Sequence, residues 1–176
     1  MRRGQLTLLV LLLLATSPVG FGQSQEILGW VEWVHVYDTS FRLKAKLDTG
    51  ARSSAIHAWD IDGFERDGVE WVRFQLHPWQ MSDLDAVDVE LPVVDRRTIR
   101  SSTGHEEARY VVRTRIRVLD RDLTADLTLT NRDEMGFRML VGREALRGSI
   151  LVDPGRSYIG PRPSRATRKR NLQEVD

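Results

Sequence analysis

Apolar and polar residues alternate one by one through most of the chain, and this period of two constrains its fold more than any other feature. Side chains of a β-strand point to opposite faces in turn, so strict alternation is typical of strands with one buried face. The longest alternating runs predict strands at residues 41–47, 72–76, 87–93, 110–118 and 123–129. Shorter β-rich runs predict further strands at 30–36 and 150–152.

Turn residues separate these runs. The expected turns lie at residues 38–40, 62–63, 67–68, 120–121 and 131–133. One segment, 143–147, has a helical composition, and Gly148 is expected to end it in the left-handed conformation. Many short strands joined by turns are typical of a β-sandwich or a small closed β-barrel. We therefore predict one all-β domain over residues 23–160, with a single short helix near its C-terminal end.

Residues 1–22 have the composition of a cleavable secretory signal peptide. Arg2 and Arg3 precede an apolar run over residues 6–15, and the small-residue pattern Gly20-Phe21-Gly22 follows. The run has half of the roughly 20 apolar residues that cross a bilayer, so a membrane span is not expected. We predict cleavage near Gly22 and a periplasmic or secreted product.

Composition excludes several classes of function. The 176-residue chain has no cysteine, which excludes disulfides, cysteine nucleophiles and thiolate metal sites. Residues 23–160 carry 19 basic and 23 acidic side chains, so nucleic acid is not an expected partner. Residues 161–176 carry five basic and two acidic side chains. This segment is expected to be a disordered, solvated tail, and contact with anionic lipid or another acidic surface is the alternative.

The candidate site follows the first long alternating run, where Asp48, Thr49 and Gly50 end the strand predicted over 41–47. Glycine lets the backbone turn tightly, because a Cβ atom is absent. A threonine hydroxyl can hydrogen-bond neighbouring backbone and fix the loop. The pattern would present Asp48 on a rigid turn, although all three residues are also common in ordinary turns.

A second element adds to this signal. Met139-Leu140-Val141-Gly142-Arg143 leads into the predicted helix. With both elements, the sequence resembles the retropepsin-like aspartic proteases, and more narrowly a bacterial branch that carries the name ATP-dependent zinc protease. The stretches that carry the resemblance are residues 47–58, 101–104, 127–132 and 137–143. Together they span the chain from Gly29 to about Gly160, and some members of that branch accompany ATP-grasp glutamate ligases.

The resemblance implies a small closed β-barrel and a role for each matching residue. Asp48 would be the catalytic aspartate, supported by the loop residues Thr49, Gly50 and Ala51. A flap over the substrate would be formed by Ser101, Ser102, Thr103 and Gly104. Gly142 and Arg143 would lie in the loop behind the catalytic turn.

Two departures from the retroviral enzymes stand out. The segment 60–95 is longer here, so the wall of the cleft is expected to differ. Arg52 stands where those enzymes carry an acidic residue, which removes a pairing for Arg143 and leaves its partner open. Trp79, within the long segment, is the best aromatic candidate for a wall of the substrate site, and the other tryptophans are expected to be packing residues.

Aspartic proteolysis needs two carboxylates within about 3 Å that share one proton. The chain holds one Asp-Thr-Gly, so the second carboxylate is expected to be Asp48 of another copy across a two-fold axis. The predicted function is therefore an exported, homodimeric aspartic endopeptidase that acts on peptides or proteins. The main alternative is a non-catalytic or weakly catalytic peptide-binding module on the same barrel, and a purely structural barrel would leave the flap and the turn without a role.

No metal or cofactor is expected. A zinc-protease helix needs two histidines four residues apart, but Arg109 stands four residues after His105. His35, His57 and His77 have no ligand spacing and are expected to be surface or packing residues, with His57 the nearest to the site. The chain also lacks a Gly-Lys-Ser/Thr phosphate loop, which argues against ATP.

Overall fold

Strands make up most of the protein, as the alternation predicted. The structure is a computed structural model that describes residues 25–37, 39, 42–79, 83–100 and 106–160. In these ranges it contains eleven strands, one 3₁₀-helix and one α-helix. The all-β prediction is confirmed. The predicted signal peptide, the predicted flap residues 101–104 and the basic segment 161–176 lie outside the described residues.

Six strands form a closed ring. In hydrogen-bonded order they are β2 (Val31–Val36), β3 (Arg42–Asp48), β10 (Met139–Gly142), β4 (Ser54–His57), β9 (Arg121–Thr130) and β8 (Glu106–Val118). A further pairing of β2 with β8 closes the ring. Strand β10 lies between β3, to which it is parallel, and β4, to which it is antiparallel. Closure leaves none of these six strands as a bare edge over its whole length.

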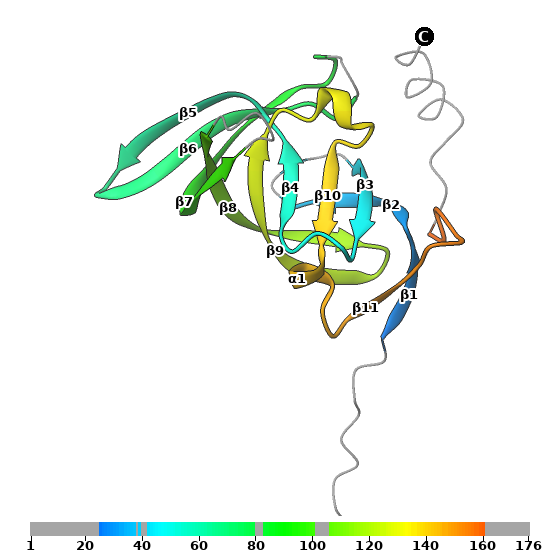
Figure 1. Ribbon diagram of the computed structural model, residues 1–176. Helices are drawn as coiled ribbons and strands as arrows, with labels where there is room; N and C mark the ends of the chain where they lie inside the picture. Colours follow the sequence, from blue (N-terminus) through cyan, green and yellow to red (C-terminus); the bar gives the residue numbers. More distant parts are fainter. Residues whose placement is uncertain (1–24, 38, 40–41, 80–82, 101–105, 161–176) are drawn as a thin grey trace, which may run out of the picture.

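A three-stranded extension grows out of the ring through β8. Strand β7 (Val87–Arg100) pairs with β8, β6 (Val69–Leu76) pairs with β7, and β5 (Trp59–Arg66) pairs with β6. We call β5, β6 and residues 87–92 of β7 the arm. Figure 1 shows the arm reaching away from the ring toward the upper left. The long segment 60–95 of the sequence therefore builds an antiparallel sheet.

Two short strands form a separate parallel sheet, namely β1 (Glu26–Gly29) and β11 (Ile150–Asp153). Ile27 and Leu151 are register partners, and both are about half exposed. In Figure 1 this sheet lies on the same lower side of the ring as α1 (Arg143–Leu146). The helix packs against β4, β9 and β10 and buries Leu146. Gly148, two residues after the helix, has a φ of 79°, which is the left-handed conformation predicted for it.

The core fills the inside of the ring and the inner face of the arm. The fully buried apolar side chains come from nearly every strand and include Leu43, Ala45, Leu47, Ile56, Val72, Phe74, Ile116, Leu127, Met139 and Val141. Burial alternates strictly along β3, where Leu43, Ala45 and Leu47 point inward. Asp48 therefore follows the pattern onto the outer face of the strand.

One predicted turn is wrong. Residues 62–63 lie inside β5, and the turn of this hairpin is at Asp67-Gly68, where both residues have positive φ. Gly63 serves a packing purpose in β5, because a Cβ atom there would lie 2.8 Å from Cζ of Tyr110. A glycine in a strand often marks such a close approach rather than a turn.

Candidate active site

Asp48 is the last residue of β3, and the chain turns immediately after it. We call residues 48–53 the Asp48 turn. The Oδ1 atom of Asp48 accepts hydrogen bonds from the backbone N–H groups of Gly50, at 3.1 Å, and Ala51, at 3.2 Å. The Ala51 N–H also approaches the Asp48 carbonyl at 3.2 Å. The carboxylate is thus held by the backbone of its own turn while its side chain remains 23% exposed.

Gly142 lies directly beside the Asp48 turn. It is the register partner of Asp48 on the parallel strand β10, and its N–H donates to Oγ of Ser54 at 3.0 Å. A Cβ atom at Gly142 would lie 2.6 Å from the carbonyl carbon of Ser53, so only glycine lets the two segments approach this closely. Gly142 therefore lies in close contact with the Asp48 turn.

Helix α1 ties the turn from the other side. The backbone N–H groups of Arg143 and Glu144 donate to the carbonyls of Ala51 (2.9 Å) and Arg52 (3.2 Å). The Arg143 guanidinium donates to the Gly50 carbonyl at 3.3 Å, which supplies the partner that the sequence left open. Three hydrogen bonds from α1 thus fix the conformation of the turn.

Arg52 has an ion-pair partner that sequence reasoning missed. Its Nε atom lies 2.8 Å from Oε1 of Glu144, the residue that follows Arg143. The basic residue of this pair is on the turn and the acidic residue is on the helix. Thr49, by contrast, is exposed, and its hydroxyl has no hydrogen bond to the described residues. The backbone contact predicted for Thr49 is therefore not seen.

The second oxygen of Asp48 faces a cation. Nζ of Lys46 lies 3.0 Å from Oδ2, and Lys46 is 41% exposed. The hydrogen bond from Lys46 is the largest cause that holds the pKa of Asp48 below its usual range, with the N–H groups of Ala51 and Gly50 acting in the same direction. Partial burial opposes this effect but does not cancel it. The Asp48 carboxylate is therefore ionised at neutral pH in the single chain.

His57 lies away from the Asp48 turn, contrary to expectation. Its backbone N–H donates to the Arg138 carbonyl at the start of β10, whereas Asp48 pairs with Gly142 at the end of that strand. His57 is fully buried, and its Nδ1 atom accepts a hydrogen bond from the Arg132 N–H at 2.9 Å. Burial, followed by the nearby Arg138 charge, lowers the pKa of His57 to about 4.

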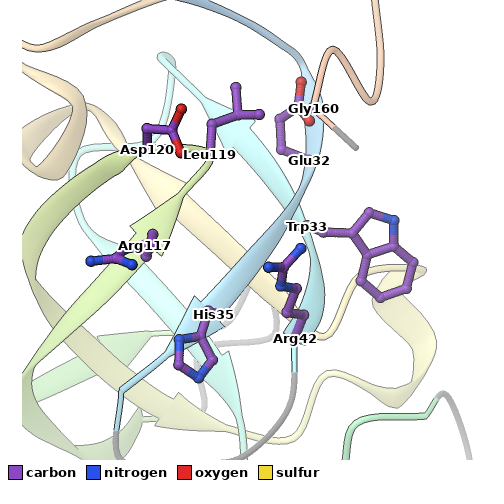
Figure 2. Close-up of a pocket in the computed structure, with 8 residues that line it drawn as sticks. All are labelled: Glu32, Trp33, His35, Arg42, Arg117, Leu119, Asp120 and Gly160. Atoms are coloured by element: carbon purple, nitrogen blue, oxygen red, sulfur yellow. The ribbon is translucent and has the colours of Figure 1, made fainter. Parts of the chain in front are cut away.

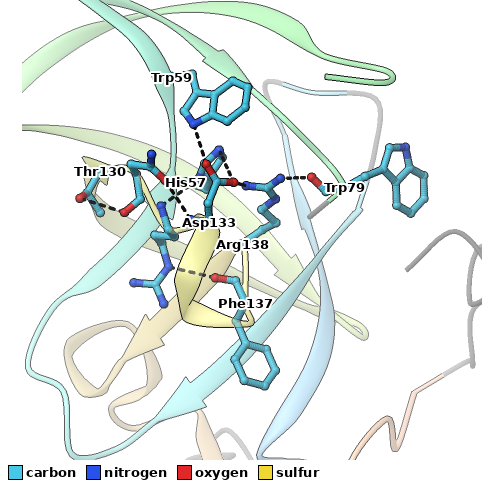
Figure 3. A network of polar contacts seen from close by, with 9 residues as sticks. His57, Trp59, Trp79, Thr130, Asp133, Phe137 and Arg138 are labelled. Carbon is cyan, nitrogen blue, oxygen red and sulfur yellow. Dashed lines mark hydrogen bonds and ion pairs between the residues drawn. The ribbon is translucent and has the colours of Figure 1, made fainter. Parts of the chain in front are cut away.

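Around His57 the structure forms a buried polar network, which we define as His57, Trp59, Asp133 and Arg138 (Figure 3). Asp133 accepts hydrogen bonds from Nη1 of Arg138 at 2.6 Å and from the Trp59 indole at 3.0 Å. Its Oδ1 atom lies 3.8 Å from Nε2 of His57. Arg138 is 2% exposed and also donates to the Trp79 carbonyl. This network joins the ring to the base of the arm.

Trp79 does not take part through its ring. Its indole N–H donates to Asp85 at 2.9 Å, within the connection from β6 to β7. Figure 3 shows the ring directed away from the network. Nothing in these contacts brings Trp79 to the Asp48 turn, so the structure does not support its expected role as a wall of the site.

One cavity among the described residues lies away from the Asp48 turn. It has a volume of about 350 Å³ and is lined by Glu32, Trp33, His35, Arg42, Arg117, Leu119, Asp120 and Gly160 (Figure 2). None of these residues belongs to the Asp48 turn. Glu32 is buried, and its Oε1 atom accepts hydrogen bonds from the N–H groups of Gly29 and Ile159, both at 2.9 Å. Its carboxylate thus ties the chain before β2 to the segment after β11.

In the described part of the chain, no three histidine, cysteine, aspartate or glutamate residues are grouped so that they could hold a metal ion. The described residues also contain no helix of the length and apolar character that a bilayer crossing requires.

The chain is similar to a protease family and to part of a group of ligases. The family described as RimB-like, retropepsin-like aspartic endopeptidase RimB, matches residues 27–163. A probable alpha-L-glutamate ligase from Desulfotalea psychrophila is 42% identical over 132 residues, 74% of this chain and 28% of that protein. A protein with the same name from Shewanella pealeana is 50% identical over 116 residues, 66% of this chain and 25% of that protein. This chain thus spans about a quarter of these curated relatives.

A solved structure has the same fold. Protein Lpg0085 of Legionella pneumophila, described as having unknown function, superposes with a TM-score of 0.65 at 30% sequence identity. The match covers 77% of this chain and 98% of the Legionella chain. Nearly the whole of that solved chain therefore corresponds to about three quarters of this one.

Proposed function

The chain belongs to the RimB-like family of retropepsin-like aspartic endopeptidases, and on this premise we propose that it hydrolyses peptide bonds through a pair of Asp48 carboxylates in a homodimer. One observation carries the proposal. The single Asp-Thr-Gly of the chain ends a strand with its carboxylate on the outer face, oriented by two backbone N–H groups and partly open to solvent. A second copy can therefore reach it.

The proposed mechanism divides the work between two identical groups. Two carboxylates about 3 Å apart cannot both be ionised, so the pair holds one proton between them. The ionised Asp48 takes a proton from a water molecule, which attacks the scissile carbonyl. The protonated Asp48 donates to the carbonyl oxygen and later transfers a proton to the leaving amine. Gly50 and Ala51 keep each carboxylate in position through this cycle.

The substrate class follows from the names of the relatives. Because the curated relatives are called probable alpha-L-glutamate ligases, peptides that contain glutamate are the first substrates to test. We do not extend ligase activity to this chain, since it corresponds to about a quarter of those proteins. The composition of residues 1–22 supports export, and N-terminal sequencing of the mature protein from cell fractions tests this part of the proposal.

One contact favours a second function. Lys46 pairs with Asp48 within the protomer, and a carboxylate neutralised in this way suits the binding of a peptide without its cleavage. The alternative is therefore a peptide-binding module on the same fold. The two functions differ in whether bound peptide is cut.

The decisive experiment is a digest of a peptide library by the wild type and by Asp48→Asn between about pH 4 and pH 8. The amide can accept the same backbone hydrogen bonds but cannot act as base or acid, so hydrolysis should fall at least about 100-fold. Asp88→Asn is the matched control, because Asp88 is exposed on β7, far along the chain from the turn. The rate should follow a bell-shaped pH profile on the acid side of neutrality.

Sedimentation measured in parallel should show a dimer in the active samples. Hydrolysis by purified Asp48→Asn, or by a strictly monomeric wild type, would show that the mechanism is wrong. Loss of activity on addition of a chelator would point to a metal instead. Peptide binding without cleavage in any sample would favour the binding module.

A further inference from the structure

Lys46 is placed by the geometry of β3 to act on Asp48. Alternate residues of a strand share a face, so Lys44, Lys46 and Asp48 all point outward while Ala45 and Leu47 point into the core. The side chain of Lys46 reaches along this face to the end of the strand. Its Nζ atom lies 3.0 Å from Oδ2 of Asp48, the oxygen that the backbone of the turn leaves open.

The other charged groups around the turn have different partners. Arg143, at the start of α1, donates to the Gly50 carbonyl at 3.3 Å. Arg52 on the turn and Glu144 on the helix pair with each other at 2.8 Å. Strand β2, on the far side of β3, contributes Glu32, whose carboxylate is engaged by Gly29 and Ile159. Lys46 is thus the one cation within ion-pair distance of Asp48 in the described part of the chain.

A cation at this position matters more for protonation than for folding. Ion pairs as exposed as this one contribute little to stability, because water screens them and two mobile side chains must be ordered. A positive charge beside a carboxylate nevertheless favours its ionised form. In a dimer built around two Asp48 side chains, each carboxylate would bring its own Lys46 to the site. The two ammonium groups would oppose the repulsion that makes such a pair retain a proton.

We propose that Lys46 is a positioning residue that pairs with Asp48 and shifts the pH range in which the two carboxylates share one proton toward acid. This inference rests on the proposed aspartic mechanism. On this proposal, the acidic pH range of activity depends on a side chain outside the Asp48 turn. Both limbs of the rate profile should therefore depend on the charge of residue 46.

The test replaces Lys46 by methionine, which keeps most of the aliphatic length and removes the charge. Both limbs of the bell-shaped profile should move to higher pH by about one unit. Lys46→Arg retains a cation and should return the profile toward that of the wild type. Lys44→Met is the matched control. Lys44 lies on the same face, but its Nζ atom sits 4.8 Å over the Phe137 ring, so its loss should leave the profile in place.

A second readout keeps this inference separate from the proposed function. The carboxyl carbon of Asp48 can be titrated by ¹³C NMR, with Asp48→Asn identifying the resonance, whether or not the protein cuts peptides. The midpoint should rise by about one pH unit in Lys46→Met and stay unchanged in Lys44→Met. Equal midpoints in the wild type and Lys46→Met would overturn the role of Lys46. Absence of hydrolysis from all variants, with the NMR shift present, would overturn the protease proposal alone.

Discussion

The two ends of strand β10 carry polar groups in opposite environments. At the Gly142 end, Asp48 is partly exposed and is held by backbone N–H groups and one lysine. At the Met139 end, His57, Asp133 and Arg138 are largely buried, and Asp133 contacts both other side chains. The first arrangement orients the carboxylate and leaves it accessible to a substrate, which suits catalysis. The second excludes water and ties the arm to the ring, which suits folding. Burial of polar groups alone would therefore direct attention away from the Asp48 end of the strand.

The largest difference between the two ends should appear in stability. Arg138→Met removes the buried guanidinium that pairs with Asp133, leaving this carboxylate and the Trp79 carbonyl without that donor. Loss of one partner of a buried ion pair typically reduces the free energy of unfolding by about 3–5 kcal/mol. Urea unfolding monitored by tryptophan fluorescence measures this change.

A double-mutant cycle sharpens the result for Arg138. Asp133→Asn should also destabilise the protein, and the double variant should lose less than the sum of the two single variants because the pair is already broken. Asp48→Asn serves as the comparison at the other end of β10 and should alter stability far less, since its oxygen can still accept the N–H bonds of Gly50 and Ala51. A small effect of Arg138→Met, equal to that of Asp48→Asn, would erase the proposed difference.

The fold was predictable wherever one face of a strand packs on the core. The predicted strand over 41–47 agrees with β3 to within one residue at each end, because burial alternates along that strand. Strand β5 could not be found in this way, since most of its side chains are exposed and its pattern is lost. The pairing of β1 with β11 joins residues more than a hundred positions apart, and such contacts leave no periodic signal in either segment.

The candidate site was predictable only where a local motif marks it, and not where it depends on contacts between distant segments. Asp48 and Gly142 are signalled by local motifs, and the structure makes them register partners. The ion pair of Arg52 with Glu144 spans 92 positions and depends on how α1 meets the turn. His57 was expected to be the histidine nearest to the site. Strand β4 runs antiparallel to β10, and its last residue, His57, therefore lies at the end of β10 opposite to Gly142.

The next difference concerns the response to acid. Burial lowers the pKa of His57 to about 4 in the folded protein, whereas the unfolded chain has the ordinary value near 6.5. Between these values the unfolded state binds a proton at His57 and the folded state does not. The free energy of unfolding therefore falls as the pH decreases from about 6.5 to about 4. The slope contributed by this one group is at most about 1.4 kcal/mol per pH unit.

His57→Asn tests this contribution, because the amide oxygen can still accept the Arg132 N–H and does not titrate. The variant should lose less stability between pH 7 and pH 4 than the wild type does, as measured by urea unfolding at each pH. Asp48 acts at lower pH, since its own pKa lies below the usual carboxyl range. Parallel stability profiles for the wild type and His57→Asn would mean that the folded protein protonates His57 freely.

The smallest effect is expected from Arg52→Gln, which removes the charge that joins the Asp48 turn to Glu144. The Arg52 side chain is 79% exposed, and such ion pairs are screened by water and salt. The Tm should fall by at most about 3 °C, and the difference should shrink further at high salt. The turn would keep its shape, because the N–H groups of Arg143 and Glu144 still donate to its carbonyls. A fall as large as that caused by Arg138→Met would mean that the exposed pair, and not the backbone, holds the Asp48 turn in place.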